Sequence, residues 1–434
     1  MIFQTLYYIV DLYFVSHLGE VAIAGVGAAG NIVFLVIALT QVINAGTMSL
    51  LSQAVGRKDH TSSNLIFNQS AALAGATALA VLVLGYPLSK AYMTAVGANQ
   101  ATTDAGTMYL ACFLPGLALQ FVLTAMGASL RATGLVKPSM IVQAVSVSLN
   151  IVLAPILIAG WFTGHPLGVA GAGYASSIAV TVGTLLMLAY FLRLQTYVRF
   201  VASEWRPRIA VWRRLLTIGL PAGGEFAFLF LYTAIIFALI RHFGDVAQAG
   251  FSIGNRLTQA IFLPGMAIAF AAGPLAGQNV GAGEVARVRA TLRASVVFCS
   301  AVMLPLTLFC QLRPEWLVHV FTQDPAVVEQ GRLFLRIISW NFVATGIIFS
   351  CSAIFQGLGN TVPSLISTGS RLVTFALPAA WMSTWPHFRI EDVWYLSVVT
   401  VTLQAATSLF LVQREFRRKF GDSADRVLRE IVEI

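Results

Sequence analysis

Apolar residues occur along this chain in long runs rather than in alternation. A segment such as ALAGATALAVLVLG (72–85) is apolar on every helical face, whereas a strand of a membrane barrel alternates apolar and polar residues over about ten positions. Each long run can cross roughly 30 Å of hydrocarbon as a helix that rises about 1.5 Å per residue. Twelve runs lie near 1–17, 28–55, 63–88, 103–127, 138–160, 168–193, 215–240, 246–280, 288–311, 328–356, 362–384 and 391–413. The pattern predicts an all-α polytopic membrane protein with 12 transmembrane helices.

Composition supports this class of protein. Apolar residues make up 57% of the chain and charged residues 10%, and the mean hydropathy is +0.79. The surface of a soluble domain requires more charge, since such domains usually contain about 25% charged residues. The first apolar run lacks the charged start and the cleavage site of a signal peptide, so we expect no removable signal peptide.

The distribution of positive charge predicts the orientation in the membrane. The formal net charge is +9, from 27 Lys and Arg residues against 18 acids. If the predicted helices alternate in direction, nineteen basic residues fall on one side and six on the other. The richer side is cytoplasmic by the positive-inside rule. We therefore expect a protein of the cell membrane with both termini in the cytoplasm, in contact with membrane lipids and not with nucleic acid.

An internal repeat divides the chain into two halves. HLGEVAIAG (17–25) recurs as HFGDVAQAG (242–250), and LLSQAVG (50–56) recurs as LAGQNVG (275–281), both displaced by 225 residues. The same displacement pairs Gly134 with Gly359, Pro138 with Pro363, and Ser139 with Ser364. Six spans per repeat, an even number, predict two six-helix lobes related by a pseudo-two-fold axis along the membrane normal. We expect an N-terminal lobe (1–193), a cytoplasmic linker (194–214), a C-terminal lobe (215–413) and a basic cytoplasmic tail (414–434).

The repeat also predicts a short first span. The residue that aligns with Met1 is Phe226. In the seventh span, Phe226 is preceded by RRLLTIGLPAGGE (213–225). The first span therefore begins about a dozen residues late and is expected to be truncated at its N-terminus, at a length that only just crosses the bilayer.

Asp11 lies inside the first span, in YYIVDLYFVSHLG (7–19). A carboxylate there costs about 2.5–3.5 kcal/mol on insertion scales. Its repeat counterpart is Ile236, so the fold accepts an apolar residue at the equivalent position. We favour ion coupling as the role of Asp11, against a structural acid satisfied by backbone or water.

Four motifs together resemble the multidrug and toxic compound extrusion (MATE) family. They are IVDLYFVSHLGEVAIAGVG (9–27), RATGLVKPS (131–139), NIVLAPILI (150–158) and QGLGNTVPS (356–364). The resemblance covers essentially the whole chain. It implies a monomeric antiporter, not an enzyme, that expels organic cations and other amphipathic small molecules in exchange for protons or sodium by alternating access between its lobes.

The resemblance implies a coupling site in the N-terminal lobe. It puts Asp11 at the acidic position of the first helix, Asn150 at an amide of the fifth helix, and Ser176 where a threonine is usual. Asp11 lies about 9 Å from the external end of its span and the other two roughly 12–15 Å deep, so all three can meet in the outer half of the lobe. The pattern breaks at Ala154, where many members carry a second aspartate. Because sodium needs several oxygen ligands, we favour proton coupling and keep sodium as the alternative.

Glu225 and Arg256 are the candidate residues of the C-terminal lobe. Each lies roughly 15 Å inside its span, Glu225 from the cytoplasmic end and Arg256 from the outside. They can form an ion pair near the midplane, because an unpaired charge there is expensive. Alternatively, Glu225 faces the cavity and attracts cationic substrates, as a seventh-helix glutamate does in relatives. Two departures weaken this parallel: Glu225 follows Pro221 by only four residues, and uncharged ATGIIFSCS (344–352) replaces a tenth-helix aspartate.

Two other classes of function remain open. A lipid or lipid-linked oligosaccharide flippase of similar architecture requires a strongly basic cavity, yet Arg256 and Arg371 are the clearest basic residues in the interior of the spans. A membrane-embedded transferase requires clustered aspartates for Mg²⁺, and no DxxD-like cluster occurs on a span. The four cysteines lie singly in apolar runs without the paired spacing of a zinc site. We expect no metal and no organic cofactor.

Overall fold

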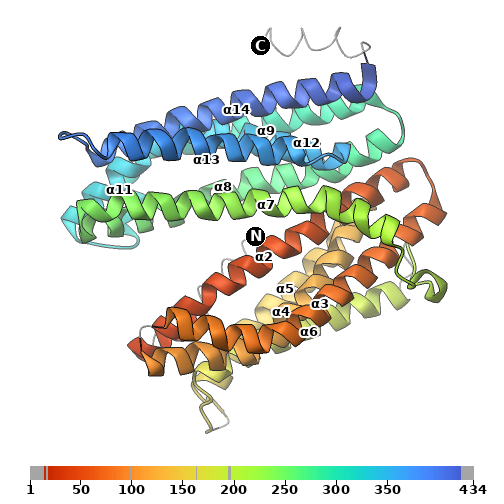
Figure 1. The fold of residues 1–434 in the computed structure, drawn as a ribbon, viewed down its shortest axis with the longest axis horizontal. Helices are drawn as coiled ribbons and strands as arrows, with labels where there is room; N and C mark the ends of the chain where they lie inside the picture. Colours follow the sequence, from red (N-terminus) through yellow and green to blue (C-terminus); the bar gives the residue numbers. More distant parts are fainter. Residues whose placement is uncertain (1–13, 16–17, 98, 163, 194–196, 422–434) are drawn as a thin grey trace. The chain divides into compact units, whose positions relative to one another are not determined.

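Long α-helices make up the described part of the chain in the computed structural model (Figure 1). The structure describes residues 14–15, 18–97, 99–162, 164–193 and 197–421. The first predicted span, with Asp11, therefore lies almost entirely outside the described residues.

The chain divides into two compact units, residues 1–223 and 224–434. The first unit contains α2 (Glu20–Gly56), α3 (His60–Val96), α4 (Gln100–Ala132), α5 (Val136–Ile158), α6 (Val169–Arg193), the short turn η1 (Ala202–Glu204) and the start of α7 (Ile209–Ile240). The second contains the rest of α7, η2 (Arg241–Phe243), α8 (Asp245–Gly281), α9 (Val285–Leu312), α10 (Pro314–His319), α11 (Pro325–Ile338), α12 (Asn341–Leu358), α13 (Val362–Met382) and α14 (Ile390–Phe420). The division between the units falls within α7, so the stretch expected to be a linker belongs to the first unit.

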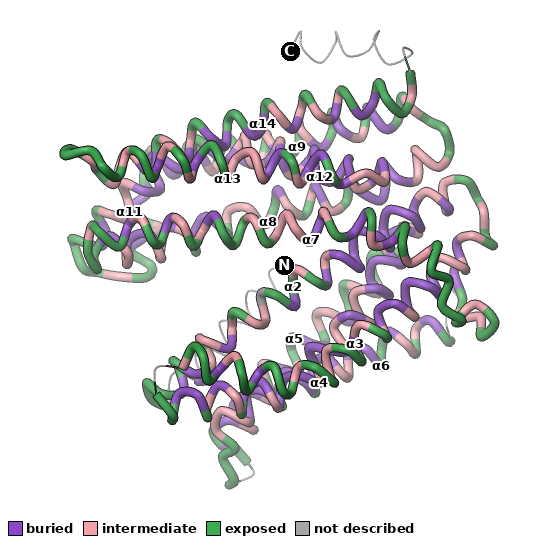
Figure 2. Tube along the Cα trace, in the orientation of Figure 1, coloured by how far each residue is buried: buried purple, intermediate pink, exposed green. Residues whose placement is uncertain are grey.

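The helices have the length and surface of membrane spans. Ten helices of the described part are long and apolar enough to cross a bilayer, and α13 occupies the eleventh predicted span. Buried and exposed residues alternate along the helices of both units (Figure 2). The exposed face of α9 carries Leu304, Leu308 and Leu312, each more than half exposed. An apolar stripe of this kind suits contact with lipid. The chain is a multi-pass, all-helical membrane protein, as the sequence predicts.

The backbone repeats at the spacing of the sequence repeat. Helices α2 and α8 each have 37 residues, with bounds displaced by 225 positions. Each begins after a glycine with positive φ, Gly19 at 98° and Gly244 at 87°. Gly134 and Gly359, which follow α4 and α12, also match, with φ of 84° and 81°. Glycine suits these positions because side chains with a Cβ rarely adopt positive φ.

The predicted continuous span 328–356 is broken into α11 and α12. The break lies at Ser339 and Trp340, and side chains of α9 bind the backbone groups that it frees. Gln311 Nε2 donates to the carbonyl of Arg336 at 2.6 Å and to Ser339 Oγ at 2.8 Å. Thr307 Oγ1 donates to the carbonyl of Ser339 at 3.1 Å. A break in a membrane helix is tolerated when neighbouring side chains satisfy its backbone in this way.

Two amide side chains of α3 hold the stretch between α6 and α7. Asn68 accepts from the amide of Val201 at 3.0 Å and donates to the carbonyl of Arg199 at 2.9 Å. Gln69 accepts from the amide of Arg208 at 2.7 Å and donates to the carbonyls of Glu204 and Arg206 at 2.5 and 2.8 Å. Both amides are fully buried. This stretch is therefore fixed to the first unit by its backbone.

Candidate functional site

Asn150 and Ser176 meet in the interior of the first unit. Both side chains are fully buried, and Asn150 Nδ2 lies 3.4 Å from Ser176 Oγ, to which it donates a long hydrogen bond. One turn before Asn150, Ser146 Oγ donates to the carbonyl of Ala179 at 2.8 Å. These two contacts join α5 to α6 and bring together two of the three residues expected at the coupling site. The third, Asp11, lies outside the described residues.

The amide oxygen of Asn150 is the unusual atom of this pair. It is buried, and no donor within the described ranges binds it. A buried acceptor without a donor costs about 1–3 kcal/mol. Ala154, one turn further along α5, is also fully buried and packs in the apolar core of the unit. The site thus offers one amide oxygen and one hydroxyl among apolar neighbours.

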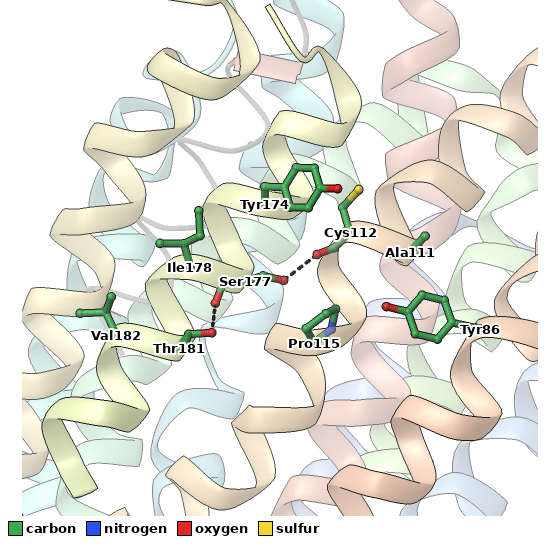
Figure 3. A pocket seen from close by; sticks show the side chains of 9 residues that line it. All are labelled: Tyr86, Ala111, Cys112, Pro115, Tyr174, Ser177, Ile178, Thr181 and Val182. Carbon is green, nitrogen blue, oxygen red and sulfur yellow. Dashed lines mark hydrogen bonds between the residues drawn. The ribbon is translucent and has the colours of Figure 1, made fainter. Parts of the chain in front are cut away.

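A hollow of about 340 Å³ lies beside a different face of α6, between α3, α4 and α6 (Figure 3). Ser177 Oγ donates to the carbonyl of Cys112 at 2.6 Å, and Thr181 Oγ1 donates to the carbonyl of Ser177 at 2.7 Å. These hydroxyls are thus bound within the protein, and no side chain that lines the hollow carries a charge. Since Ser177 faces this hollow and Ser176 faces Asn150, the hollow is separate from the predicted coupling site.

In the second unit, Glu225 is held by two hydroxyl groups. Ser352 Oγ on α12 and Ser364 Oγ on α13 donate to Glu225 Oε2 at 3.0 and 2.9 Å, and the two hydroxyl oxygens lie 3.0 Å apart. Glu225 is half-buried on α7, whereas Ser364 is buried. The carboxylate therefore ties α7 to the C-terminal half of α12 and to the start of α13.

Arg256 does not meet Glu225. It is exposed on α8, and the ion pairs of the described residues do not include it. Arg371 is closer in sequence than Arg256 to the two serines that bind Glu225, and it lies two turns along α13 from Ser364. Its guanidinium lies 4.0 Å from the centre of the Tyr232 ring, a cation–π contact, and Nη1 lies 3.5 Å from Gln404 Oε1.

The two serines and the Arg371 contact were not predicted as partners of a site. A serine in an apolar span gives no distinctive signal, because most such hydroxyls bond to their own helix. Ser364 did carry one indication, since it recurs as Ser139 in the other half of the sequence. Tyr232 and Arg371 are far apart in sequence, and only the packing of α7 against α13 brings them together.

The fold and the repeated loops define a class of protein, the polytopic membrane transporters built from two repeated halves. The MatE family model matches residues 1–156 and 221–382, and the chain belongs to this family, the MATE transporters.

Relatives and solved structures agree with this family. A "FAD transporter" of Shewanella oneidensis is 24% identical over 413 residues, which cover 93% of this chain and 89% of that protein. A "Probable multidrug resistance protein NorM" of Thermotoga maritima is 26% identical, over 88% of this chain and 82% of that one. A "Multidrug export protein MepA" of Staphylococcus aureus is 26% identical, over 82% and 78%. The fold resembles a crystal structure of MATE in the straight conformation, with a TM-score of 0.90 at 23% identity, over 96% of this chain and 93% of that one.

Proposed function

We propose that this transporter exports amphipathic organic cations across the cell membrane in exchange for protons, by alternating access between its two halves. The substrate class is supported by relatives that are named as multidrug resistance or multidrug export proteins. Such an exchange requires an acid that binds a cation on one side of the membrane and releases it on the other. Membrane-embedded acids are the residues suited to that role.

The observation that carries the proposal is the environment of Glu225. Its carboxylate lies on a membrane-spanning helix, and its hydrogen bonds come from neutral hydroxyls, among them those of Ser352 and Ser364, rather than from a cation. Hydroxyl donors offset only part of the cost of an ionised carboxylate in hydrocarbon. A transported cation or a proton would offset the rest. We assign Glu225 to the attraction of cationic substrate.

The coupling ion is assigned to the first unit, with Asp11, Asn150 and Ser176. A protonated carboxyl group is a hydrogen-bond donor, and the buried Asn150 oxygen needs one. Ala154 contributes no oxygen beside this pair, which leaves few ligands for sodium. These features support the proton over sodium as the coupling ion.

A second candidate cargo is flavin adenine dinucleotide. It is supported by the Shewanella oneidensis relative named as a FAD transporter, which aligns with 93% of this chain. FAD is anionic, so its export would not depend on the charge of Glu225 in the way that cation export does.

Transport by the purified full chain in liposomes tests these proposals. Ethidium transport is followed by fluorescence under a pH gradient alone and under a sodium gradient alone of equal size. We expect the pH gradient to drive ethidium against its own gradient. Transport driven only by sodium would overturn the assignment of the ion. Transport of FAD but not ethidium would overturn the assignment of the substrate class.

A further inference from the structure

A small hollow lies at the end of the first unit where α2 ends and α3 and α7 begin. Its volume is about 100 Å³, well below the roughly 300 Å³ at which sites for drug-sized ligands begin. Its lining combines two guanidinium groups with an amide, a hydroxyl and apolar walls, and includes Arg57, Arg214, Gln53, Ser62, Leu50 and Val211. The hollow therefore has room for one small group of negative charge, not for a transported drug.

The surroundings of the hollow are strongly basic. Lys58 and Arg213 adjoin its two arginines in sequence, and all four basic side chains are exposed. Within the described ranges, neither Arg57 nor Arg214 forms an ion pair with a carboxylate. Two guanidinium groups thus face one hollow whose lining includes no carboxylate.

Asp59 is the acid closest in sequence to Arg57, and its carboxylate caps a helix. Its Oδ1 accepts a hydrogen bond from the amide of Ser62 at 2.9 Å and so caps the start of α3. Hydrogen bonds from Ser62, and to a smaller extent the positive charge of Arg57, hold the pKa of Asp59 below its usual value. The carboxylate therefore stays ionised as a helix cap, and it does not line the hollow.

The other half of the molecule shows that the turn itself does not need an arginine. Arg57 follows α2 with φ and ψ of −73° and −5°, and its repeat counterpart Ala282 follows α8 with −75° and −8°. The same backbone forms with a methyl side chain. The guanidinium of Arg57 is thus free for a role that the second unit does not share.

We propose that Arg57 and Arg214 bind the phosphate of an anionic phospholipid in the cytoplasmic leaflet. Guanidinium groups bind phosphate through paired, charge-assisted hydrogen bonds. The hollow lies at the ends of membrane-spanning helices, where a head-group phosphate can enter it, and its apolar walls suit the carbon atoms bonded to that phosphate. Basic pockets between helices on the cytoplasmic side bind anionic head groups in this way. The proposal uses the orientation predicted from charge and does not depend on the transported substrate.

Thermal unfolding of the purified full chain in detergent tests the site, with phosphatidylglycerol, phosphatidylcholine or inorganic phosphate added. The test variant is Arg57→Gln/Arg214→Gln. The control variant is Lys58→Gln/Arg213→Gln, which removes the same charge from adjacent positions outside the lining. We expect phosphatidylglycerol to raise the unfolding midpoint of the wild type and of the control by about 5 °C at saturation, and to leave the test variant unchanged.

Native mass spectrometry supplies a second readout, the number of phosphatidylglycerol molecules that each form of the protein retains. If the double variant fails to fold, the single variant Arg214→Gln takes its place. The wild type is expected to retain at least one molecule more than either variant of the lining. An equal loss in the control variant would overturn the site in favour of general attraction to basic residues. An equal effect of phosphatidylcholine would overturn the preference for an anionic lipid, and an equal effect of inorganic phosphate would identify a soluble anion as the ligand.

Discussion

Ser364 Oγ lies 2.9 Å from Oε2 of Glu225 and donates a hydrogen bond to it. Ser364 is the third residue of α13, just after the loop that carries the repeated motif. Glu225 lies in the membrane-spanning part of α7. The contact therefore links an acid to a loop motif that the chain carries twice. Arg256, which was expected to neutralise this acid, is not among the groups that bind it.

Glu225→Gln is expected to reduce the efflux of cationic drugs on the order of tenfold, equal to about 1.4 kcal/mol, and to leave the efflux of neutral drugs near the wild-type rate. Glutamine keeps the size of the side chain and an oxygen that accepts from the two serines, but it removes the charge. The measurement compares initial rates of ethidium and of a neutral substrate in proteoliposomes.

Arg256→Gln serves as the control for this variant. Because Arg256 is exposed and does not meet Glu225, we expect nearly unchanged efflux of both kinds of drug. Equal losses in the two variants, for charged and neutral drugs alike, would instead support a structural ion pair.

Ala154→Asp is expected to make efflux depend on sodium. The new carboxylate would lie one turn after Asn150 and add oxygen ligands to the Asn150–Ser176 pair, and a hard cation binds through such oxygens. The measurement is the efflux rate as a function of sodium concentration. Ala154→Asn, which adds an oxygen without charge, is expected to show a smaller change. An ion preference unchanged in Ala154→Asp would contradict the argument for proton coupling.

Gly173→Ala is expected to destabilise the first unit by about 1–3 kcal/mol. A Cβ at this position would lie 2.7 Å from both the carbonyl oxygen of Tyr109 and the Cβ of Cys112 on α4, so α6 would have to move. Gly75→Ala is the matched control, since a Cβ there meets nothing within 4 Å and alanine favours the helix. Thermal unfolding should separate the two variants; a lower midpoint for Gly75→Ala than for Gly173→Ala would refute the packing argument.

Gln69→Ala is expected to expose the stretch between α6 and α7 to trypsin. The change removes three hydrogen bonds to the backbone of Glu204, Arg206 and Arg208. Cleavage follows the population of the open form when opening is rapid, so we expect cleavage at the two arginines to be at least about tenfold faster. Gln259→Ala on the exposed face of α8 is the control. Identical digestion of the two variants would show that Gln69 does not hold this stretch.

Most of the helical fold could be predicted from the sequence because long apolar runs with few charges mark the spans. The duplication was also readable, since glycines with positive φ recur at one spacing, as Gly134 and Gly359 do. The helix break at Ser339 and Trp340 could not be predicted from the sequence. Neither residue is a helix breaker, and the break is stabilised by Gln311, which lies on another helix.

The sequence predicted how deep each candidate site residue lies in its span, but not which neighbouring helix its side chain contacts. Residue counts placed Asn150 and Ser176 at similar depth, and the structure brings them together. The same reasoning gave Glu225 and Arg256 similar depths, yet the structure keeps them apart. Depth follows from the number of residues in a helix, whereas contact depends on which face of each helix is turned to its neighbour.

Proton movement in response to drug tests the central claim most directly. Proteoliposomes that contain a pH-sensitive dye receive ethidium with no imposed gradient, and the full chain is compared with Asp11→Asn, at equal amounts in the membrane. If drug and proton exchange through the first unit, ethidium should drive protons across the membrane with the wild type and drive none with Asp11→Asn. Equal proton movement in the two forms would contradict the assignment of Asp11 to coupling, and ethidium transport by the wild type without proton movement would contradict proton exchange itself.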